Sequence, residues 1–136
     1  MAHIQNEVIV DAAPEAVWNA VRDVGNLHTR LVPGIVTATR LEDDARIVTF
    51  ASGAQVRERI VGIDDQARRL VWSIEGEIGG IPVIHHQGSL EVFAVSATRS
   101  RLVWHTDILP AVLGDMVRPN IENGMKIMQR TLEERG

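Results

Sequence analysis

Apolar side chains recur with a helical period in the last third of the chain. Five of them follow Pro110 at intervals of three or four residues: Val117, Ile121, Met125, Met128 and Leu132. Such spacing places the side chains in one stripe along a helix. The sequence therefore predicts a long amphipathic helix between Pro110 and the end of the chain.

Upstream of this helix, short segments alternate apolar and polar residues, as strands with one buried face do. The expected strands are Ile4–Val10, Ile35–Leu41, Arg46–Ala51, Gln55–Ile63, Arg68–Glu75, Val83–Val95 and Arg101–Leu109. Two short helices are expected between the first two strands. The first begins at Pro14, because proline suits the first helical position, and the second ends at Pro33. This order predicts an α+β fold in which a seven-stranded antiparallel sheet wraps around the C-terminal helix.

Side chains alternate between the two faces of a strand, so every second residue shares a face. If hairpins turn at residues 64–67 and about Ala97, the even-numbered residues of the paired strands lie together. These positions carry large apolar side chains, so we expect them on the concave face, against the helix. A cavity between this face and the helix should be lined by Glu58, Trp72, Ile74, His86, Trp104 and Thr106, with Met125 from the helix.

Pro119 lies inside the expected C-terminal helix. Proline has no N–H to donate, and its ring crowds the carbonyl group four residues earlier, at Asp115. We therefore expect a bend or a break between Asp115 and Pro119, which would set how wide one end of the cavity opens.

Two titratable side chains are expected on the concave face, and both are candidate catalytic residues. His86 could act as a general base, since imidazole titrates near neutral pH. A carboxylate at Glu58 would have a raised pKa or would pair with a cation. Their strands should lie about 9–10 Å apart, so a ligand or water would have to connect them. The alternative, which we favour, is that both side chains form structural hydrogen bonds.

Composition narrows the classes of function. The 136 residues carry a net charge of −4 without a basic cluster, which argues against nucleic-acid binding. There is no cysteine, and the histidines do not show the spacing of a metal site, so no metal or cofactor is expected. No apolar run is long enough for a transmembrane segment, and no signal peptide is recognised. We expect one domain over residues 1–136, in the cytoplasm, as a monomer or homodimer.

Four segments together resemble a known family: VIVDAAPEAVWNAVRDVGNL, VRERIVGIDDQARRLVWSIEG, IPVIHHQGSLEVF and RLVWHTDILP. Their order is similar to that of the polyketide cyclase/dehydratase-like branch of the START/Bet v 1 (SRPBCC) superfamily. The resemblance implies the helix-grip fold and an apolar ligand cavity. It does not imply a catalytic set, because the superfamily includes cyclases, lipid carriers, quinone-binding proteins and co-chaperones.

Three functions follow as hypotheses. The first is binding of a small hydrophobic or aromatic molecule, such as a lipid, quinone or polyketide, in the cavity. The second is a polyketide cyclase or dehydratase that uses acid–base chemistry there. The third is a protein-interaction module of the co-chaperone kind, for which an exposed apolar patch and a filled core would be evidence.

Overall fold

The computed structural model describes residues 1–135, which form a sheet of seven antiparallel strands and a long helix. The strands of the sheet are β1 (Ala2–Val10), β2 (Val36–Glu42), β3 (Ala45–Phe50), β4 (Gln55–Asp64), β5 (Arg69–Glu75), β8 (His85–Ala94) and β9 (Ser100–Leu109). Their order is β1-β9-β8-β5-β4-β3-β2, so β1 and β2 are the edges. A separate hairpin of β6 (Glu77–Ile78) and β7 (Ile81–Pro82) connects β5 with β8.

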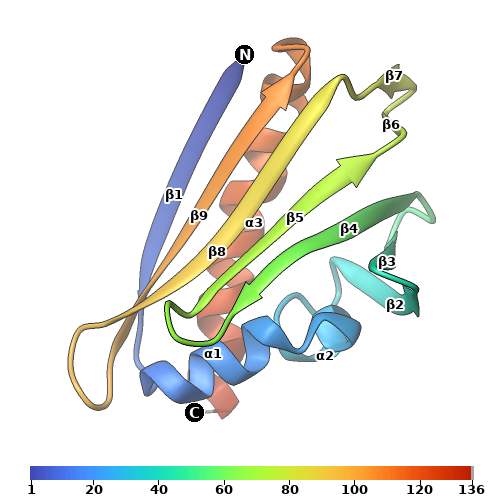
Figure 1. Ribbon diagram of the computed structural model, residues 1–136. Coiled ribbons are helices and arrows are strands. Elements are labelled where there is room, and N and C mark those ends of the chain that lie inside the picture. Colours follow the sequence, from blue (N-terminus) through green and yellow to red (C-terminus); the bar gives the residue numbers. More distant parts are fainter. Residues whose placement is uncertain (136) are drawn as a thin grey trace.

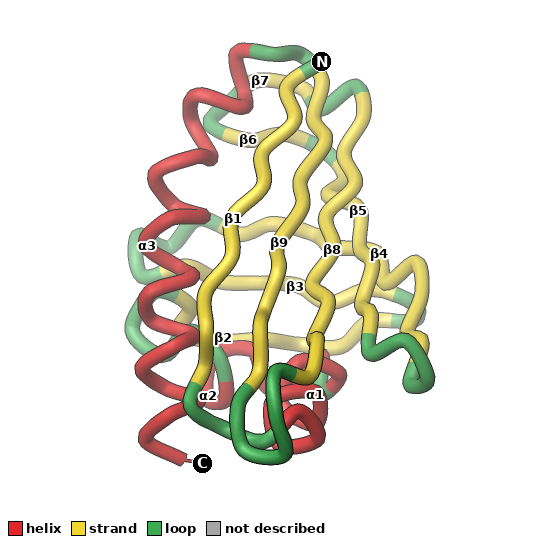
Figure 2. Tube along the Cα trace, turned by 90° about the vertical axis from the view of Figure 1, so that its left-hand side faces the viewer, coloured by secondary structure: helices red, strands yellow, loops and turns green. Residues whose placement is uncertain are grey.

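The helices lie along the sheet and across one end of it (Figures 1 and 2). The short elements α1 (Pro14–Arg22), η1 (Val24–Asn26) and α2 (Leu27–Arg30) follow β1, and α3 (Val112–Arg135) ends the described chain. The backbone of α3 runs beside β1 and β9, and its C-terminal end lies near α1. The predicted helix-grip architecture is confirmed. Within residues 1–135, no helix combines the length and apolar character needed to cross a bilayer.

Of the bend or break expected between Asp115 and Pro119, the break is contradicted by the structure. The helix begins at Val112 and continues through Pro119 without interruption. Both Pro119 and Asp115 are exposed. Water can therefore hydrogen-bond to the Asp115 carbonyl that has lost its usual N–H partner, so the proline does not end the helix.

The strand register places the even-numbered residues on the concave face, as the alternation predicts. In the β8–β9 hairpin, Leu90 pairs with Trp104 and Val92 with Leu102, symmetrically about Ala97. In the β4–β5 hairpin, Glu58 pairs with Ile74, and the register shifts by a bulge after Ile60. The bulge ends the simple alternation in β4, and Ile63, beyond it, pairs with Leu70.

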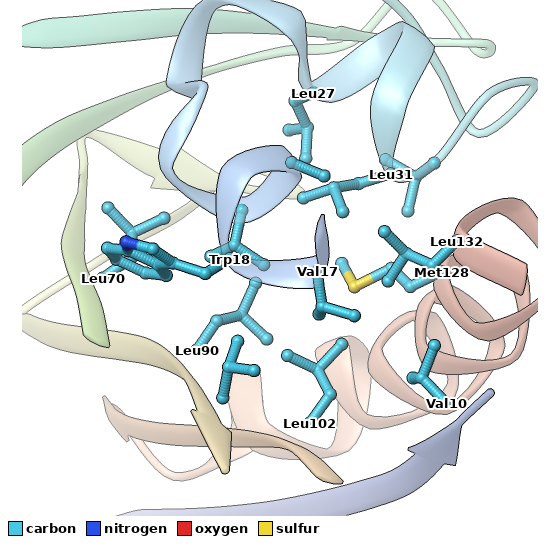
Figure 3. Close-up of a cluster of buried hydrophobic side chains, with 14 of the residues drawn as sticks. Val10, Val17, Trp18, Leu27, Leu31, Leu70, Leu90, Leu102, Met128 and Leu132 are labelled. Carbon is cyan, nitrogen blue, oxygen red and sulfur yellow. The ribbon is translucent and has the colours of Figure 1, made fainter. Parts of the chain in front are cut away.

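An apolar cluster fills the concave face beneath α1, α2 and the C-terminal half of α3 (Figure 3). We call it the apolar core; its labelled members in Figure 3 are Val10, Val17, Trp18, Leu27, Leu31, Leu70, Leu90, Leu102, Met128 and Leu132. The predicted helix stripe contributes to this interior, with Ile121, Met125, Met128 and Leu132 buried and Val117 half-buried. Trp18 is fixed further by a 2.9 Å hydrogen bond from its Nε1 to Oδ1 of Asp65.

Two side chains of α3 bind the backbone of the first strand and of the residue that follows it. Nε2 of Gln129 donates to the carbonyl oxygen of Ile9 at 2.7 Å. The backbone N–H of Asp11 donates to Oε2 of Glu133 at 2.8 Å. The helix is therefore joined to the β1 edge by hydrogen bonds as well as by apolar packing.

Candidate functional site

A row of neighbouring residues crosses the concave face from β3 to β8. Arg46 on β3 pairs with Glu58 on β4, and Glu58 pairs with Ile74 on β5. His86 on β8 comes next, because its ring is hydrogen-bonded to the backbone of Ile74. We call Arg46, Glu58, Ile74 and His86 the polar row.

A buried ion pair begins the polar row. Nε of Arg46 donates to Oε1 of Glu58 at 2.7 Å, and the two residues are only 2% and 8% exposed. Nη1 of Arg46 also donates to the carbonyl oxygen of Val24 at 3.3 Å. The guanidinium carbon lies 5.8 Å from the ring centroid of Trp72, within the range of a cation–π contact. Of the two expectations for Glu58, the structure therefore shows pairing with a cation.

Arg46 was not among the site residues predicted from the sequence. Arg46 occupies an even-numbered position in a predicted strand, with Val48 and Phe50 on the same face. That alternation is a signal that could have identified an inward-facing arginine. Its partner could not be identified in this way, because the pairing depends on the register between β3 and β4.

His86 closes a gap between two strands. The backbone ladder between β5 and β8 ends at the pair Trp72 and Gly88. Beyond it, the N–H of Ile74 donates to Nδ1 of His86 at 2.9 Å, and the Ser73 hydroxyl donates to the His86 carbonyl oxygen at 2.8 Å. The ring thus takes the place of a strand-to-strand hydrogen bond, which is a structural role.

Burial also controls the charge of His86. The residue is 5% exposed, and this loss of solvation, with a smaller contribution from neighbouring His85, lowers the pKa of His86 to about 4. The imidazole is therefore neutral at pH 7. Since Nδ1 accepts the Ile74 N–H, the ring proton must be on Nε2.

Two tryptophans form a wall beside the polar row. Trp72 lies flat over Gly88, where an added Cβ atom would come within 2.6 Å of its Cε2. The rings of Trp72 and Trp104 meet edge to face, with centroids 5.9 Å apart. Trp104 extends to α3, where a Cβ atom on Gly124 would lie 3.4 Å from its Cζ3. Small residues on β8 and α3 therefore make room for both aromatic rings.

Several apolar side chains near the row are incompletely covered. Ile60, Ile74 and Trp104 point inward by register and pack against the apolar core, yet each is only half-buried. In contrast, Thr106 and Met125 are 2% and 1% exposed. This part of the concave face therefore has apolar surface that the described chain does not cover.

The structure brings some of the predicted lining residues together and leaves others apart. Glu58, Ile74 and His86 are neighbours in the polar row, and Trp72 contacts Trp104. One strand separates Glu58 from His86, as expected from the sequence, and no hydrogen bond joins their side chains within residues 1–135. Thr106 pairs with Gly88 beneath Trp72, and Met125 belongs to the apolar core. A single cavity lined by all seven residues stays a prediction.

Two hollows in the described chain lie away from the polar row. One has a volume of about 500 Å³ and is lined by Asn19, Arg22, Asp23, Val24, Gly25, Arg30 and Leu41. The other, of about 240 Å³, is lined by Ala12, Ala16, Val17, Asn19, Ala20, Arg30 and Leu132. None of the predicted lining residues borders either hollow. In the larger one, Nη1 of Arg30 pairs with Asp23 at 3.0 Å, so its charges are already partly satisfied by the protein. We therefore place the candidate site on the concave face.

Similar solved structures share this fold. XoxI from Bacillus cereus is 20% identical, with a TM-score of 0.80, 99% of this chain covered and 95% of that chain. The di-domain ARO/CYC protein BexL is 18% identical with a TM-score of 0.80; the match covers 98% of this chain and 47% of BexL. Truncated norcoclaurine synthase from Thalictrum flavum is 15% identical with a TM-score of 0.74, covering 98% and 91% of the two chains. These TM-scores show that the chains share a common fold.

The sequence of this chain matches a protein family as a whole, although it matches no single curated protein. No curated protein is significantly similar to this chain in sequence. The family described as polyketide cyclase/dehydrase and lipid transport, however, matches residues 1–133. The resemblance noted in the four sequence segments is thereby confirmed, and the chain belongs to the polyketide cyclase/dehydrase and lipid transport family.

Proposed function

We propose that the protein binds a small hydrophobic or aromatic molecule between the concave face of the sheet and α3. The observation that carries this proposal is the half-buried apolar surface of Ile60, Ile74 and Trp104 beside a row of buried polar groups. Apolar surface supplies binding energy at roughly 25 cal/mol per Å² removed from water, before the costs of association. A few polar groups in such a site would fix the orientation of the ligand.

An acid–base enzyme, such as a polyketide cyclase, is the second candidate function. It is supported by the family, whose description includes polyketide cyclases. The hydrogen bonding of His86 argues against its acting as the base. Its Nδ1 lone pair already accepts the Ile74 N–H, and its Nε2 carries a proton. Glu58 is the better candidate base, because only Oε1 is hydrogen-bonded to Arg46 among the described residues.

The binding proposal is tested with a neutral fluorescent probe, N-phenyl-1-naphthylamine. Trp104→Ala should raise the dissociation constant at least about tenfold, because it removes a large part of the apolar wall. His86→Ala should raise it less. Phe93→Ala is the matched control, since Phe93 stacks with Arg101 on the outer face of the sheet.

The alternatives predict different results. An enzyme would lose turnover in Glu58→Gln while keeping its affinity for substrate, because the carboxylate would act mainly in the transition state. If neither this probe nor another small apolar molecule binds, and the interior proves to be filled, both the binding hypothesis and the enzyme hypothesis are wrong. The protein-interaction module would then be the leading hypothesis.

A further inference from the structure

We infer that the ligand carries an uncharged carbonyl group, whose oxygen accepts a hydrogen bond from Nε2 of His86. The inference rests on the proposed binding function and specifies the chemistry of the ligand. It follows from a buried histidine in which one ring nitrogen is bound to the backbone and the other has no partner among residues 1–135.

The protein determines which nitrogen of His86 carries the ring proton. The N–H of Ile74 donates to Nδ1 at 2.9 Å, so Nδ1 uses its lone pair and carries no proton. A neutral imidazole has one N–H, which is therefore on Nε2. The Ser73 hydroxyl, which donates to the His86 carbonyl oxygen at 2.8 Å, holds the same residue in place. His86 is thus a hydrogen-bond donor with a fixed orientation.

The Nε2–H lies on the side of the ring that is turned away from β5. Nδ1 faces Ile74 on β5, and Nε2 is across the ring from Nδ1. On the other side of β8 the neighbouring strand is β9, where Ile108 pairs with His86 and Thr106 is the next residue on the same face. No group within the described part of the chain accepts a hydrogen bond from Nε2. The concave face therefore carries one unpaired donor here.

An oxygen atom has room to reach this donor. In residues 1–135, the one side-chain nitrogen or oxygen of the buried and half-buried residues that is unpaired and also fully shielded is Nε1 of Trp104. Nε2 of His86 is unpaired but not fully shielded, so an atom of the size of a water oxygen can touch it. The residue as a whole is only 5% exposed. A buried N–H without an acceptor is unfavourable, so the position favours a molecule that supplies one.

The surroundings favour an acceptor without charge. Burial lowers the pKa of His86 to about 4, so the ring offers no positive charge to an anion at pH 7. The guanidinium of Arg46, at the other end of the polar row, is already paired with Glu58 at 2.7 Å. A carboxylate ligand would therefore lose its hydration without gaining a counter-ion. A carbonyl oxygen accepts a hydrogen bond and brings no donor that needs a partner of its own, whereas a hydroxyl does.

The apolar part of the ligand would contact the tryptophan wall. The Trp72 ring lies over Gly88, which is two residues from His86 on the same face of β8. Trp104 meets Trp72 edge to face and is half-buried, so part of its surface can still be covered. Ketones and quinones with a flat apolar body combine such a surface with a carbonyl oxygen, and this is the class of ligand that we infer.

Three compounds of similar size test this inference by isothermal titration at pH 7. The first, 2-acetonaphthone, is a ketone; 2-isopropenylnaphthalene has nearly the same shape, with C=CH₂ in place of C=O; 2-naphthoate is an anion. We expect the ketone to bind at least about fivefold more tightly than the isopropenyl compound, because the latter leaves the Nε2–H without an acceptor. The ketone should also bind more tightly than 2-naphthoate, which would lose its hydration.

A matched pair of variants assigns the effect to His86. The carbonyl stretching frequency of bound 2-acetonaphthone, labelled with ¹³C at the carbonyl, should lie below its value in hexane because the oxygen is hydrogen-bonded. In His86→Asn, the amide oxygen can still accept the Ile74 N–H, but no group takes the place of Nε2–H. The frequency should then return toward its value in hexane, and the preference for the ketone should disappear. His85→Asn is the control at the neighbouring exposed position, and it should keep both.

Each outcome has a distinct meaning. If the ketone and the isopropenyl compound bind equally well, or the carbonyl frequency stays at its value in hexane, the carbonyl inference is wrong and the binding proposal stands. Tighter binding of 2-naphthoate than of the ketone would contradict an uncharged acceptor. If none of the compounds binds, both proposals are wrong. If His86→Asn does not fold, the affinities and the carbonyl frequency in the parent protein still decide, together with the ¹⁵N shifts of the His86 ring, which must show the proton on Nε2.

Discussion

The apolar core and the polar row occupy the same concave face, yet they differ in how closely they are packed and in the charge that they carry. In the core, Val17, Leu31 and Leu102 are at most 1% exposed. In the row, Ile74 is half-buried, while Arg46 and Glu58 bring charges into the interior. Closely packed apolar side chains stabilise the interior of a protein. Buried ion pairs, in contrast, add little or nothing to its stability. The core therefore accounts for most of the burial that stabilises the fold, and the row is where we propose that a ligand is recognised.

A charge placed in the core should have the largest effect. Met125→Asp would bury an unpaired carboxylate at a position that is 1% exposed. We expect the free energy of unfolding to fall by more than about 4 kcal/mol, measured by urea denaturation. Lys126→Asp, at the neighbouring exposed position, is the control and should change it by less than about 1 kcal/mol. Equal stability of the two variants would mean that the sheet does not enclose α3.

Breaking the ion pair should come next. Arg46→Met leaves the Glu58 carboxylate buried without its partner, and the loss should be about 3–5 kcal/mol at pH 7. The double variant Arg46→Met with Glu58→Leu should recover most of that loss, because no charge is left buried. A double variant that recovers none of the loss would show that the pair itself stabilises the fold.

The burial of His86 predicts a dependence on pH. Its pKa in the fold, about 4, lies below the ordinary value of 6.5. As the pH falls from 6.5 to 4, the unfolded chain gains a proton that the folded chain cannot accept. Stability present above pH 6.5 is therefore lost over this interval, by about 3 kcal/mol from this group. Urea denaturation at pH 7, 5 and 4 should show that His86→Gln loses less stability on acidification than the parent does.

The smallest expected effect is the difference between two truncations. Leu102→Ala, at a fully buried position, should cost about 2–5 kcal/mol because it leaves a cavity. Ile74→Ala, at a half-buried position, should cost about 1–2 kcal/mol less than Leu102→Ala, because less of its side chain is removed from water. Thermal unfolding measures both. Equal costs would show that the row is packed as tightly as the core.

The sequence predicts more of the core than of the row. Alternation and helical spacing are repeated over many residues, so the strands, the concave face and the helix stripe could be predicted from them. Alternation also placed Glu58 on the concave face and could have done so for Arg46. Their pairing could not be predicted, because the partner of Arg46 depends on the register of β3 with β4. The other two differences between the predicted and the observed structure, at Pro119 and at the hairpin of β6 and β7, also depend on tertiary structure. The solvent-exposed side of α3 accommodates Pro119, and the hairpin of β6 and β7 is formed by segments of two residues each.

The hydrogen bond from Gln129 to the carbonyl oxygen of Ile9 has a consequence for assembly. An edge strand is a template on which another chain can add a strand, and sheets that extend in this way aggregate. On β1 one acceptor of that template is already occupied by a side chain of α3, and the Asp11 N–H just beyond it is occupied as well. The opposite edge, β2, carries a bulge between Val36 and Ala38, and bulges also interrupt strand pairing. Copies of this chain that associate should therefore do so through side-chain surfaces rather than through a continuous intermolecular sheet.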